Sequence, residues 1–509
     1  MPVSPARAAA FEILQRIETT DAYASELLHA SRLARLSQAD HGLLTELVMG
    51  VLRWRAVLDN KIAEHYGRPP ADLTSADRMR NSPLLAKEAR SGAPPSRKIP
   101  ALVANNATRT GHPDLALGKL DWEVLTALRL GAYQILFLDR VPRHAAVNDS
   151  VELVKIAHKR SAAGLVNAVL RKIERAPSDL NRSSTHPDWL VERWTRIYGS
   201  DAARKICEYD NTAPEQAISI AGAEGVERLS TGKTRTSPPQ HAKGGRVGDP
   251  GSAPISFLDE LRDEGIQLEP GKLLSSAFRV NSGDITRSQA FRERRLTIQD
   301  EGSQLVALLV GHGKNLLDCC AAPGGKTRIM AEQNPEAMVL AMDLHPKRAA
   351  LLRKLVPADN VRVVAADARK MPFSGNFDRI LVDAPCSGTG TLARNPEIKW
   401  RLRPQDLPRL QEYQVEILRA AMKQVAHGGQ IIYSTCSLEL EENSEVVEQA
   451  LETDASFRLV DCRDRLQELQ VSGELVWEEV ESLMSGPYLR TIPGVHPCDG
   501  FFAAILEKT

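Results

Sequence analysis

Five short apolar runs in the second half of the chain decide its fold. They are LLDCC (316–320), MVLAMDL (338–344), VRVVAADA (361–368), FDRILVDAP (377–385) and QIIYSTC (430–436). Stretches with helical spacing of apolar residues separate most of them. Strands that alternate with helices are typical of a doubly wound, mostly parallel sheet. We therefore expect an α/β Rossmann-like domain over residues 299–509.

Polar or reactive side chains stand at the carboxyl ends of all five predicted strands. Asp318 lies near the end of the first run, and Asp343, Asp367, Asp383 and Cys436 lie at or just beyond the ends of the others. In open α/β sheets, ligands bind outside the carboxyl ends of the strands. The sequence therefore predicts a ligand site along this edge of the sheet.

The first strand runs into the glycine turn DCCAAPGGKT, residues 318–327. Gly324 and Gly325 remove side chains where the backbone must approach a ligand closely, and the helix that follows has free N–H groups that favour an anionic group. The turn fits neither the dinucleotide fingerprint nor the P-loop. Taken alone, it is equally well read as a tight connection between a strand and a helix.

Two aspartates strengthen the interpretation as a cofactor site. Asp343 ends the second strand, where an acidic residue can accept hydrogen bonds from both ribose hydroxyls. Asp367, at the end of the third strand, suits the exocyclic amine of an adenine. Either residue alone could equally be a helix N-cap or a solvated loop carboxylate. Both together, after a glycine turn, favour a site for the nucleoside part of a cofactor over these alternatives.

Cys386, in DAPCSGTGT, and Cys436, in YSTCS, follow the fourth and fifth strands. These strands are usually neighbours, about 5 Å apart, so both thiols should open beside the cofactor turn. A disulfide is disfavoured in a reducing compartment, a zinc site needs about four ligands and has no nearby Cys or His pair here, and a redox pair would usually show C-x-x-C. Two inert buried thiols stay possible, although Ser387, Ser434 and Ser437 make the surroundings polar.

A methylation of cytosine at carbon 5 fits this pair of thiols better. Carbon 5 is a poor nucleophile until a thiolate adds to carbon 6, after which it can attack a sulfonium methyl group. A second cysteine can assist the release of the first. Asp383 can hydrogen-bond the base edge, and Lys326 could hold charge near the base or lower the pKa of a thiol. Position alone leaves open which thiol attacks.

The first part of the chain has a different texture. Helical spacing over residues 4–66, 122–138 and 145–173 predicts an all-helical domain over 1–182, with Ser4 as N-cap and Pro5 at the first helical position. A small α+β linking domain is expected over 183–298. Segments rich in Pro, Ser and Gly predict flexible insertions over 67–118 and 222–255.

Charge and cysteine content restrict the class of protein. The 509 residues carry 65 basic and 65 acidic side chains, but residues 1–182 carry 26 against 19. This excess is compatible with a phosphate-facing surface and equally with a solvated charged face. Seven cysteines, an odd number, without a secretory leader indicate free thiols and a cytoplasmic protein. We expect no membrane span, because no run approaches 18 apolar residues.

The motifs DCCAAPGGKT, DLHPKR, AADAR, DAPCSGTGTLARNPEIKW, YSTCSLELEEN and DGFFAAIL occur in order over residues 300–507. Together they closely resemble the bacterial RsmB/Sun group of 16S rRNA 5-methylcytosine methyltransferases, in the NOL1/NOP2/Sun superfamily. LVMGVLRWRAVLD (47–59) and residues 128–173 resemble its NusB-like RNA-binding domain, and HPDWLVERW (186–194), FRVN (278–281) and LTIQDEGSQLVALL (296–309) resemble its linking section.

The resemblance implies a class I S-adenosylmethionine-dependent methyltransferase domain without a metal, acting on a cytosine in 16S rRNA, either free or in an early assembly intermediate. It implies no obligate protein partner. It implies that Cys436 is the nucleophile and that Cys386 assists product release. The implied cofactor contacts are Cys320, Ala321, Ala322, Pro323, Gly324, Gly325, Lys326, Asp343, Asp367 and Asp383. Two other functions stay open: a tRNA cytosine-5 methyltransferase, and a non-catalytic RNA-binding factor in ribosome assembly.

Overall fold

The computed structural model describes residues 3–28, 33, 35–66, 117–174, 185–220 and 257–509. These form two compact units, which we call the helical unit (Met1–Ala213 with Thr391–Asp406) and the sheet unit (Pro214–Gly390 with Leu407–Thr509). The expected insertion 222–255 and residues 67–116 of the expected insertion 67–118 lie outside the described residues. Residues 117 and 118 belong to the short helix η4 (Leu117–Lys119).

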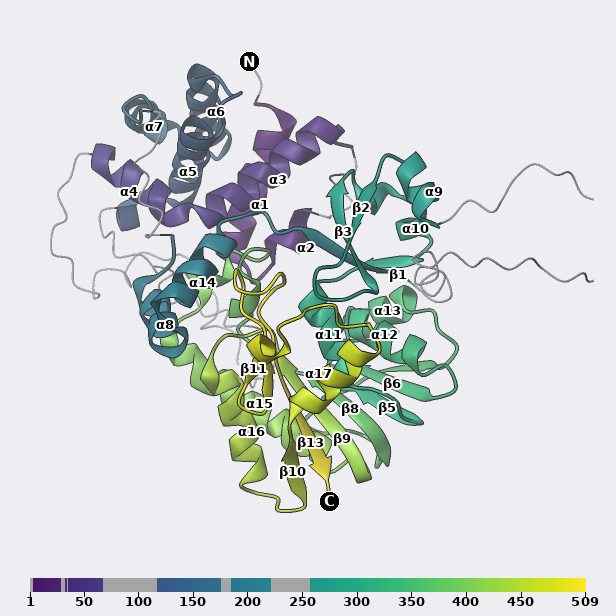
Figure 1. The fold of residues 1–509 in the computed structure, drawn as a ribbon. Helices are drawn as coiled ribbons and strands as arrows, with labels where there is room; N and C mark the ends of the chain where they lie inside the picture. Colours follow the sequence, from purple (N-terminus) through teal and green to yellow (C-terminus); the bar gives the residue numbers. More distant parts are fainter. Residues whose placement is uncertain (1–2, 29–32, 34, 67–116, 175–184, 221–256) are drawn as a thin grey trace, which may run out of the picture. The chain divides into compact units, whose positions relative to one another are not determined.

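The helical unit confirms the all-helical prediction for the first part of the chain (Figure 1). Its helices are α1 (Pro5–Thr19), α2 (Ala24–Leu28), α3 (Gln38–Arg53), α4 (Arg55–Tyr66), α5 (Trp122–Phe137), α6 (Arg143–Ile156), η5 (Arg160–Ala162), α7 (Ala163–Leu170) and α8 (Asp188–Asp210). The Ser4 side chain accepts from the Arg7 amide at 3.4 Å, and Pro5 opens α1, as predicted. The apolar faces of α1 to α7 share one core.

A segment from late in the chain completes the helical unit. Thr391–Asp406 carries α14 (Ile398–Arg401) and η10 (Pro404–Asp406) and clusters with the N-terminal helices. The Trp400 Nε1 donates to the Leu52 carbonyl at 2.7 Å, and Arg401 donates to the Ile17 carbonyl at 2.7 Å. The last carbonyls of a helix have no partner within that helix. The segment supplies donors to such carbonyls at the ends of α1 and α3 and so caps both helices.

The sheet unit begins with a small antiparallel sheet in the order β2-β3-β1-β4. Its strands are β1 (Gln216–Ile220), β2 (Gln267–Pro270), β3 (Ala277–Ser282) and β4 (Leu296–Ile298), and α9 (Phe257–Asp263), η8 (Ile285–Arg287) and α10 (Gln289–Arg292) accompany them. These elements bury a small core of their own. They have the α+β character expected for the linking section over 183–298, although residues of that range up to Ala213 belong to the helical unit.

The large sheet confirms the doubly wound prediction. Its order is β11-β12-β13-β9-β8-β5-β6-β7, with β10 also paired to β13. The strands are β5 (Asn315–Asp318), β6 (Met338–Asp343), β7 (Val361–Ala365), β8 (Phe377–Asp383), β9 (Val425–Thr435), β10 (Phe457–Val460), β11 (Met484–Ser485), β12 (Tyr488–Arg490) and β13 (Phe502–Lys508). The five predicted strands, β5 to β9, are parallel, and β13 joins them antiparallel.

Helices cover both faces of this sheet, and each face has its own apolar core. One core includes residues of α11 (Glu301–Leu309), α12 (Gly325–Gln333), α13 (Pro346–Leu355) and α17 (Cys462–Val471). The other includes residues of α15 (Leu407–Met422) and α16 (Ser444–Leu451). Burial on both faces explains why the strands read as continuous apolar runs, and it leaves the strand ends as the place for polar groups.

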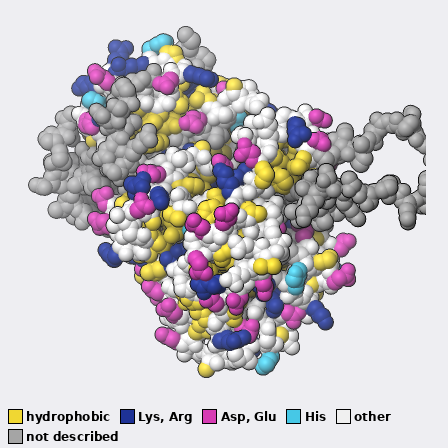
Figure 2. Space-filling view, viewed as in Figure 1, with side chains coloured by type: hydrophobic (Ala, Val, Ile, Leu, Met, Phe, Trp, Pro, Cys, Tyr) yellow, Lys and Arg dark blue, Asp and Glu magenta, His cyan; other side chains and the backbone are white. Residues whose placement is uncertain are grey.

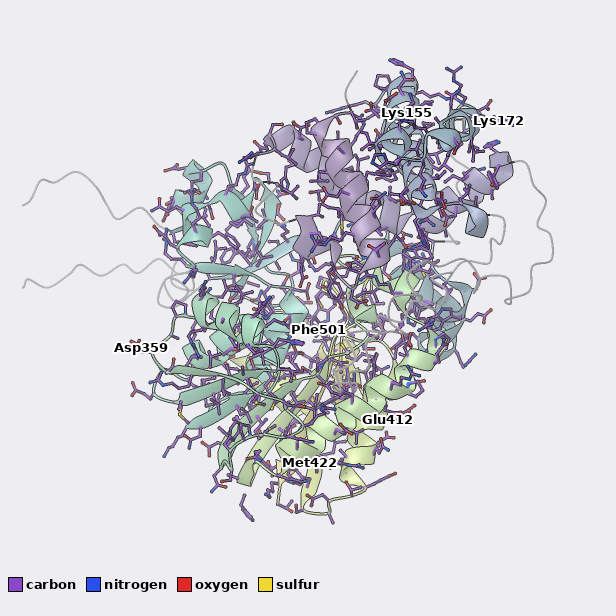
Figure 3. The ribbon with its side chains drawn as sticks, turned by 180° about the vertical axis from the view of Figure 1, so that it is seen from behind. Lys155, Lys172, Asp359, Glu412, Met422 and Phe501 are labelled. Carbon is purple, nitrogen blue, oxygen red and sulfur yellow. The ribbon has the colours of Figure 1, made fainter. Side chains whose placement is uncertain are left out.

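The surface carries charges of both signs. Lys and Arg side chains alternate with Asp and Glu side chains on the face drawn in Figure 2, in keeping with the zero net charge. Lys155 and Lys172, labelled in Figure 3, lie on the outside of the helical unit. Among the described residues, no helix is long and apolar enough to cross a membrane.

Candidate active site at the strand ends

The structure brings the two cysteines together. Strands β8 and β9 pair in parallel with Asp383 opposite Ser434, so the loops that follow them start side by side. The Cys386 and Cys436 sulfurs are 3.4 Å apart. Both are free thiols, half-buried at the predicted edge of the sheet. A single planar base placed over this edge could therefore meet both sulfurs.

The surroundings of Cys386 favour its protonated form. The hydrogen bond with Cys436, then burial, and then the negative charges of Cys436, Glu442 and Asp383 raise the pKa of the Cys386 thiol well above its usual value. A thiol held protonated is a poor attacking group, since the thiolate is the nucleophile. Cys386 is better suited to exchange a proton than to add to a base.

Lys326 and Asp383 form an ion pair beside the thiols. The Lys326 ammonium lies 2.7 Å from Asp383 Oδ2, and the Ser434 hydroxyl donates to Asp383 Oδ1 at 2.8 Å. The ammonium is also 5.1 Å from the ring centre of Phe501, which Figure 3 labels. Burial opposes the charge on Lys326, but Asp383 and, less strongly, Cys436 outweigh it and raise the lysine pKa. Lys326 thus supplies a fixed positive charge at this site.

The glycines of the turn are required by the protein itself. Gly324 has a φ of 120°, and a Cβ there would lie 2.5 Å from Leu352 and 2.6 Å from Val356. A Cβ at Gly325 would lie 2.7 Å from Gln299 Oε1. We expected these glycines to make room for a ligand. The structure gives a second reason, which is that α12 packs too closely on its neighbours for any side chain.

The same turn contains an acceptor that lacks a partner. Gln299 is buried, and its Oε1 has no hydrogen-bond partner among the described residues, although its Nε2 donates to Ser303 at 3.1 Å. This oxygen lies beside Gly325, at the amino end of α12. A buried acceptor without a donor is costly, so the position suits a ligand that carries a donor such as an ammonium group. The turn therefore fits the amino-acid part of S-adenosylmethionine.

The two predicted nucleoside-binding aspartates differ in how free they are. Asp343, at the end of β6, accepts from the His345 amide at 2.9 Å and has Arg348 3.5 Å from its other oxygen. It retains acceptor capacity for a ribose. Asp367 instead binds Arg369 through both oxygens, and this hydrogen bonding lowers the pKa of Asp367. An adenine amine would have to share that carboxylate with Arg369.

Asp318, the acid at the end of β5, has a structural partner. Its Oδ2 accepts from the Thr327 hydroxyl at 2.7 Å, which joins the strand to the first turn of α12. Burial raises the pKa of Asp318 to about 7. Through its bond to Thr327, the Asp318 carboxyl group stabilises the turn between β5 and α12.

Sequence reasoning missed a buried polar cluster behind the cysteines. Glu442, Asn443 and Gln414 are at most 1 % exposed and contact residues on either side of both thiols. The only available signal was that Glu442 and Asn443 follow YSTCS within the quoted motif YSTCSLELEEN. In a glutamate-rich stretch, nothing local distinguishes a buried acid from a solvated one.

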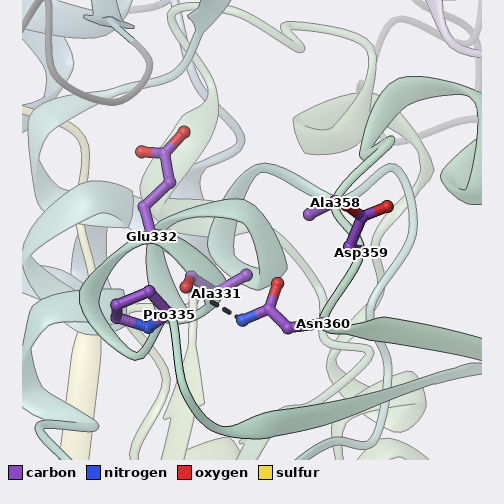
Figure 4. Close-up of a pocket in the computed structure, with 6 residues that line it drawn as sticks. All are labelled: Ala331, Glu332, Pro335, Ala358, Asp359 and Asn360. Atoms are coloured by element: carbon purple, nitrogen blue, oxygen red, sulfur yellow. Dashed lines mark hydrogen bonds between the residues drawn. The ribbon is translucent and has the colours of Figure 1, made fainter.

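A separate pocket lies at the opposite edge of the large sheet (Figure 4). It is lined by Ala331, Glu332, Pro335, Ala358, Asp359 and Asn360, from the end of α12 and the turn before β7. Asn360 already donates to the carbonyls of Ala331 at 3.2 Å and Asn334 at 3.0 Å. Its polar groups thus serve the local fold, and the chemistry gathers at the strand ends.

Comparisons with known proteins agree with this arrangement. Residues 306–507 match the family described as 16S rRNA methyltransferase RsmB/F, and residues 4–79 and 114–175 match the NusB family. The chain is 31% identical to a probable ribosomal RNA small subunit methyltransferase B of Bacillus subtilis over 100% of both chains. It is 31% identical to ribosomal RNA small subunit methyltransferase B of Vibrio cholerae, over 74% of this chain and 80% of that one.

Among solved structures, that of PH0851 covers 100% of both chains with a TM-score of 0.68 and 21% identity, which supports the fold. The full-length likeness to the Bacillus subtilis protein and the two family matches bear out the resemblance seen in the motifs. This chain belongs to the RsmB/F family of 16S rRNA methyltransferases, with an N-terminal NusB-family domain.

Proposed function

We propose that this protein methylates carbon 5 of a cytosine in 16S rRNA, using S-adenosylmethionine and a covalent bond between Cys436 and carbon 6 of the base. The observation that carries the proposal is the 3.4 Å separation of the Cys386 and Cys436 sulfurs beside the Lys326–Asp383 ion pair. A methyl transfer from a sulfonium to oxygen or nitrogen needs no thiol. Carbon 5 of a pyrimidine needs one thiolate to activate it and a second group to end the reaction.

The first step forms a bond between the Cys436 sulfur and carbon 6, and the electron pair of the 5,6 double bond moves so that carbon 5 becomes nucleophilic. Lys326 holds positive charge near the attacking thiolate. Asp383, whose side chain is 28% exposed, keeps lone pairs free to accept from the base edge and to stabilise positive charge on the ring.

Bound S-adenosylmethionine supplies the methyl group that carbon 5 takes. The cofactor contacts proposed for this chain are the turn from Cys320 to Lys326, together with Asp343, Asp367 and Asp383; Gln299 adds an acceptor. Cys386 then assists release: it passes its thiol proton to the departing Cys436 sulfur and takes the proton from carbon 5, while the electron pair of that C–H bond re-forms the 5,6 double bond and the bond between carbon 6 and Cys436 breaks. Its 3.4 Å distance from Cys436 supports a role at the same ring. The helical unit, with its NusB-family match, is proposed to hold the RNA.

The two cysteine variants test this division of labour. Methyl transfer to 16S rRNA should vanish in Cys436→Ala, and no covalent adduct should form. Cys386→Ala should accumulate a protein–RNA adduct, seen as a denaturant-resistant band. Cys207→Ala, which removes a thiol from α8 of the helical unit, is the matched control and should turn over normally. Full activity of Cys436→Ala would remove the nucleophile assignment, and free turnover of Cys386→Ala would remove the release role.

Bisulfite sequencing of total RNA from a strain that lacks the protein tests the substrate. One cytosine in 16S rRNA should lose its methyl group. Loss of the methyl group from a tRNA instead would overturn the rRNA assignment and leave the chemistry intact. Unchanged methylation in all RNA, with no cofactor binding by calorimetry, would support a non-catalytic assembly factor.

A further inference from the structure

Glu442 lies behind the two thiols and has no role in the reaction proposed above. It ends η11 (Leu440–Glu442), six residues after Cys436, and its side chain is fully buried. A buried carboxylate must be matched by donors, because its desolvation is otherwise too costly. The donors that match it come from the loops that carry Cys386 and Cys436.

Four donors meet the two oxygens of Glu442. Oε1 accepts from the Ser387 amide at 2.8 Å and from Gln414 Nε2 at 3.0 Å. Oε2 accepts from the Ser437 hydroxyl at 2.5 Å and from the Ser387 hydroxyl. An ionised carboxylate offers about four lone-pair sites, so the anion matches this set completely, whereas a protonated acid would bring a fifth hydrogen. Burial raises the pKa of Glu442, and the serine, backbone and glutamine donors oppose that rise.

The contacts hold both chain neighbours of each cysteine. Ser387 and Ser437 directly follow Cys386 and Cys436. On the preceding side, Gln414 Nε2 also donates to the Pro385 carbonyl at 2.8 Å. Asn443 accepts from the Thr435 hydroxyl at 2.5 Å and donates to the Ser437 carbonyl at 2.9 Å. The two loops are therefore joined to one buried cluster rather than placed independently.

The cluster also brings a negative charge close to Cys386. The charge of Glu442 is among the causes that raise the pKa of Cys386. The Ser387 amide, one residue from that sulfur, is bonded directly to the carboxylate. An anion behind Cys386 and an ammonium, Lys326, near Cys436 give the two thiols unlike surroundings.

We propose that Glu442 is a positioning residue that fixes the spacing of the two thiols and holds a negative charge behind Cys386, the thiol that does not attack. The proposal rests on the two-cysteine function proposed above. It adds a residue that acts through Ser387 and Ser437 and touches neither the base nor the cofactor.

The test is Glu442→Gln in the full-length protein, with Glu445→Gln as matched control. Glu445 lies in the first turn of α16, where its side chain is exposed and accepts a hydrogen bond from Gln411 Nε2 at 3.0 Å. The glutamine keeps the volume of Glu442 but removes the charge and turns one pair of acceptor sites into donors. Circular dichroism and thermal melting establish that each variant is folded.

The first measurement is the rate at which iodoacetamide alkylates each thiol as a function of pH, read by peptide mass spectrometry without RNA or cofactor. In Glu442→Gln, the alkylation profile of Cys386 should move to lower pH, because a nearby like charge that raises the pKa of this thiol has been removed. The Glu445→Gln profile should match the unmodified protein. A purely structural role would loosen both thiols alike and would not lower the pKa of one of them.

The second measurement is steady-state methyl transfer. Glu442→Gln should lower kcat by at least about tenfold, since a misplaced reacting group costs rate, while KM for RNA stays within about twofold. An unchanged Cys386 profile together with an unchanged kcat overturns the proposal. The alkylation profile tests the role of Glu442 independently of the methylated atom, because it needs neither RNA nor cofactor. Absence of a Cys436–RNA adduct in the unmodified protein would instead overturn the proposed function.

If Glu442→Gln does not fold, Ser387→Ala and Ser437→Ala carry the test. Each keeps the carboxylate and deletes one hydroxyl donor. Both should lower kcat with little change in KM for RNA, because the loop is released on one side only. Normal kcat in both variants would overturn the positioning role.

Discussion

Lys399 gives the helical unit a stability that depends on pH in an unusual range. Its side chain is almost fully buried, and its ammonium donates to the Arg53 carbonyl at 3.2 Å. Burial lowers its pKa from 10.5 to about 8, although Asp210 opposes the shift. Between about pH 8 and 10.5 the unfolded chain therefore binds a proton that the folded chain has lost. Stability from this group rises with pH through that window, and below pH 8 the full penalty of burying the charge applies.

The size of the effect follows from the shift. From 10.5 to about 8 is some two and a half units, which corresponds to about 3 kcal/mol. Lys399→Met keeps the length of the side chain and removes the charge. The gain in unfolding free energy of the variant over the unmodified protein should be largest at pH 7 to 8 and should fall by about 3 kcal/mol by pH 10.5. The lost bond to Arg53 costs about 1 kcal/mol at every pH and so does not affect the fall.

Urea unfolding followed by tryptophan fluorescence measures this difference. Five of the six tryptophans lie in the helical unit, at Trp54, Trp122, Trp189, Trp194 and Trp400, so the signal reports mainly on that unit. Lys155→Met is the control, because it removes the same charge from a side chain that is 41% exposed and so pays no comparable cost of burial. A Lys399→Met difference that stays constant within about 0.5 kcal/mol from pH 7 to 10.5 would refute the reasoning.

Three further changes test the cofactor end of the sheet unit. Asp318→Asn should make the stability of the sheet unit less dependent on pH. Burial raises the pKa of Asp318 to about 7, so the stabilisation from its protonated form is complete below about pH 4 and is lost as pH rises through 7. The unfolding free energy, measured from pH 4 to 8, should therefore fall less in the variant than in the unmodified protein. Gly324→Ala should cost about 1–3 kcal/mol more than Gly428→Ala in thermal unfolding, since both glycines have positive φ but only Gly324 lacks room for a Cβ. Asp343→Asn should weaken S-adenosylmethionine binding by calorimetry about tenfold or more, because a site built to accept from ribose hydroxyls loses its charge, with Asp359→Asn at the opposite sheet edge unchanged.

Much of the fold was readable because its signals are local. Continuous apolar runs, each ending in a polar residue, predicted β5 to β9 and the edge at which Asp343, Asp383 and Cys436 lie. The Ser4–Pro5 pair predicted the start of α1, and the structure confirms it. These features depend on the periods of strands and helices and on capping, which a short stretch of sequence contains.

What sequence could not show depends on contacts between distant residues. NPEIKW follows the Cys386 loop directly, and nothing in it indicates that Trp400 bonds to Leu52 in the helical unit. Glu442 reads as one of several solvated glutamates in ELEEN, yet its four donors come from positions 387, 414 and 437. Only the folded chain decides which acid is buried and matched.

Position alone also left open which thiol attacks, because both cysteines follow neighbouring strands and both are flanked by serine. The surrounding charges distinguish them. The Lys326 ammonium interacts with Cys436 and so places a positive charge near that residue. Glu442 and Asp383 act on Cys386, where their negative charges disfavour a thiolate. Of two sulfurs 3.4 Å apart, Cys386 is the one whose raised pKa makes it the poorer attacking group, and this is the physical argument behind the proposed choice of Cys436 as nucleophile. If Glu442→Gln increases the rate at which Cys386 is alkylated relative to Cys436, the surrounding charges, rather than the order of the strands, distinguish the proposed nucleophile from the proposed release group.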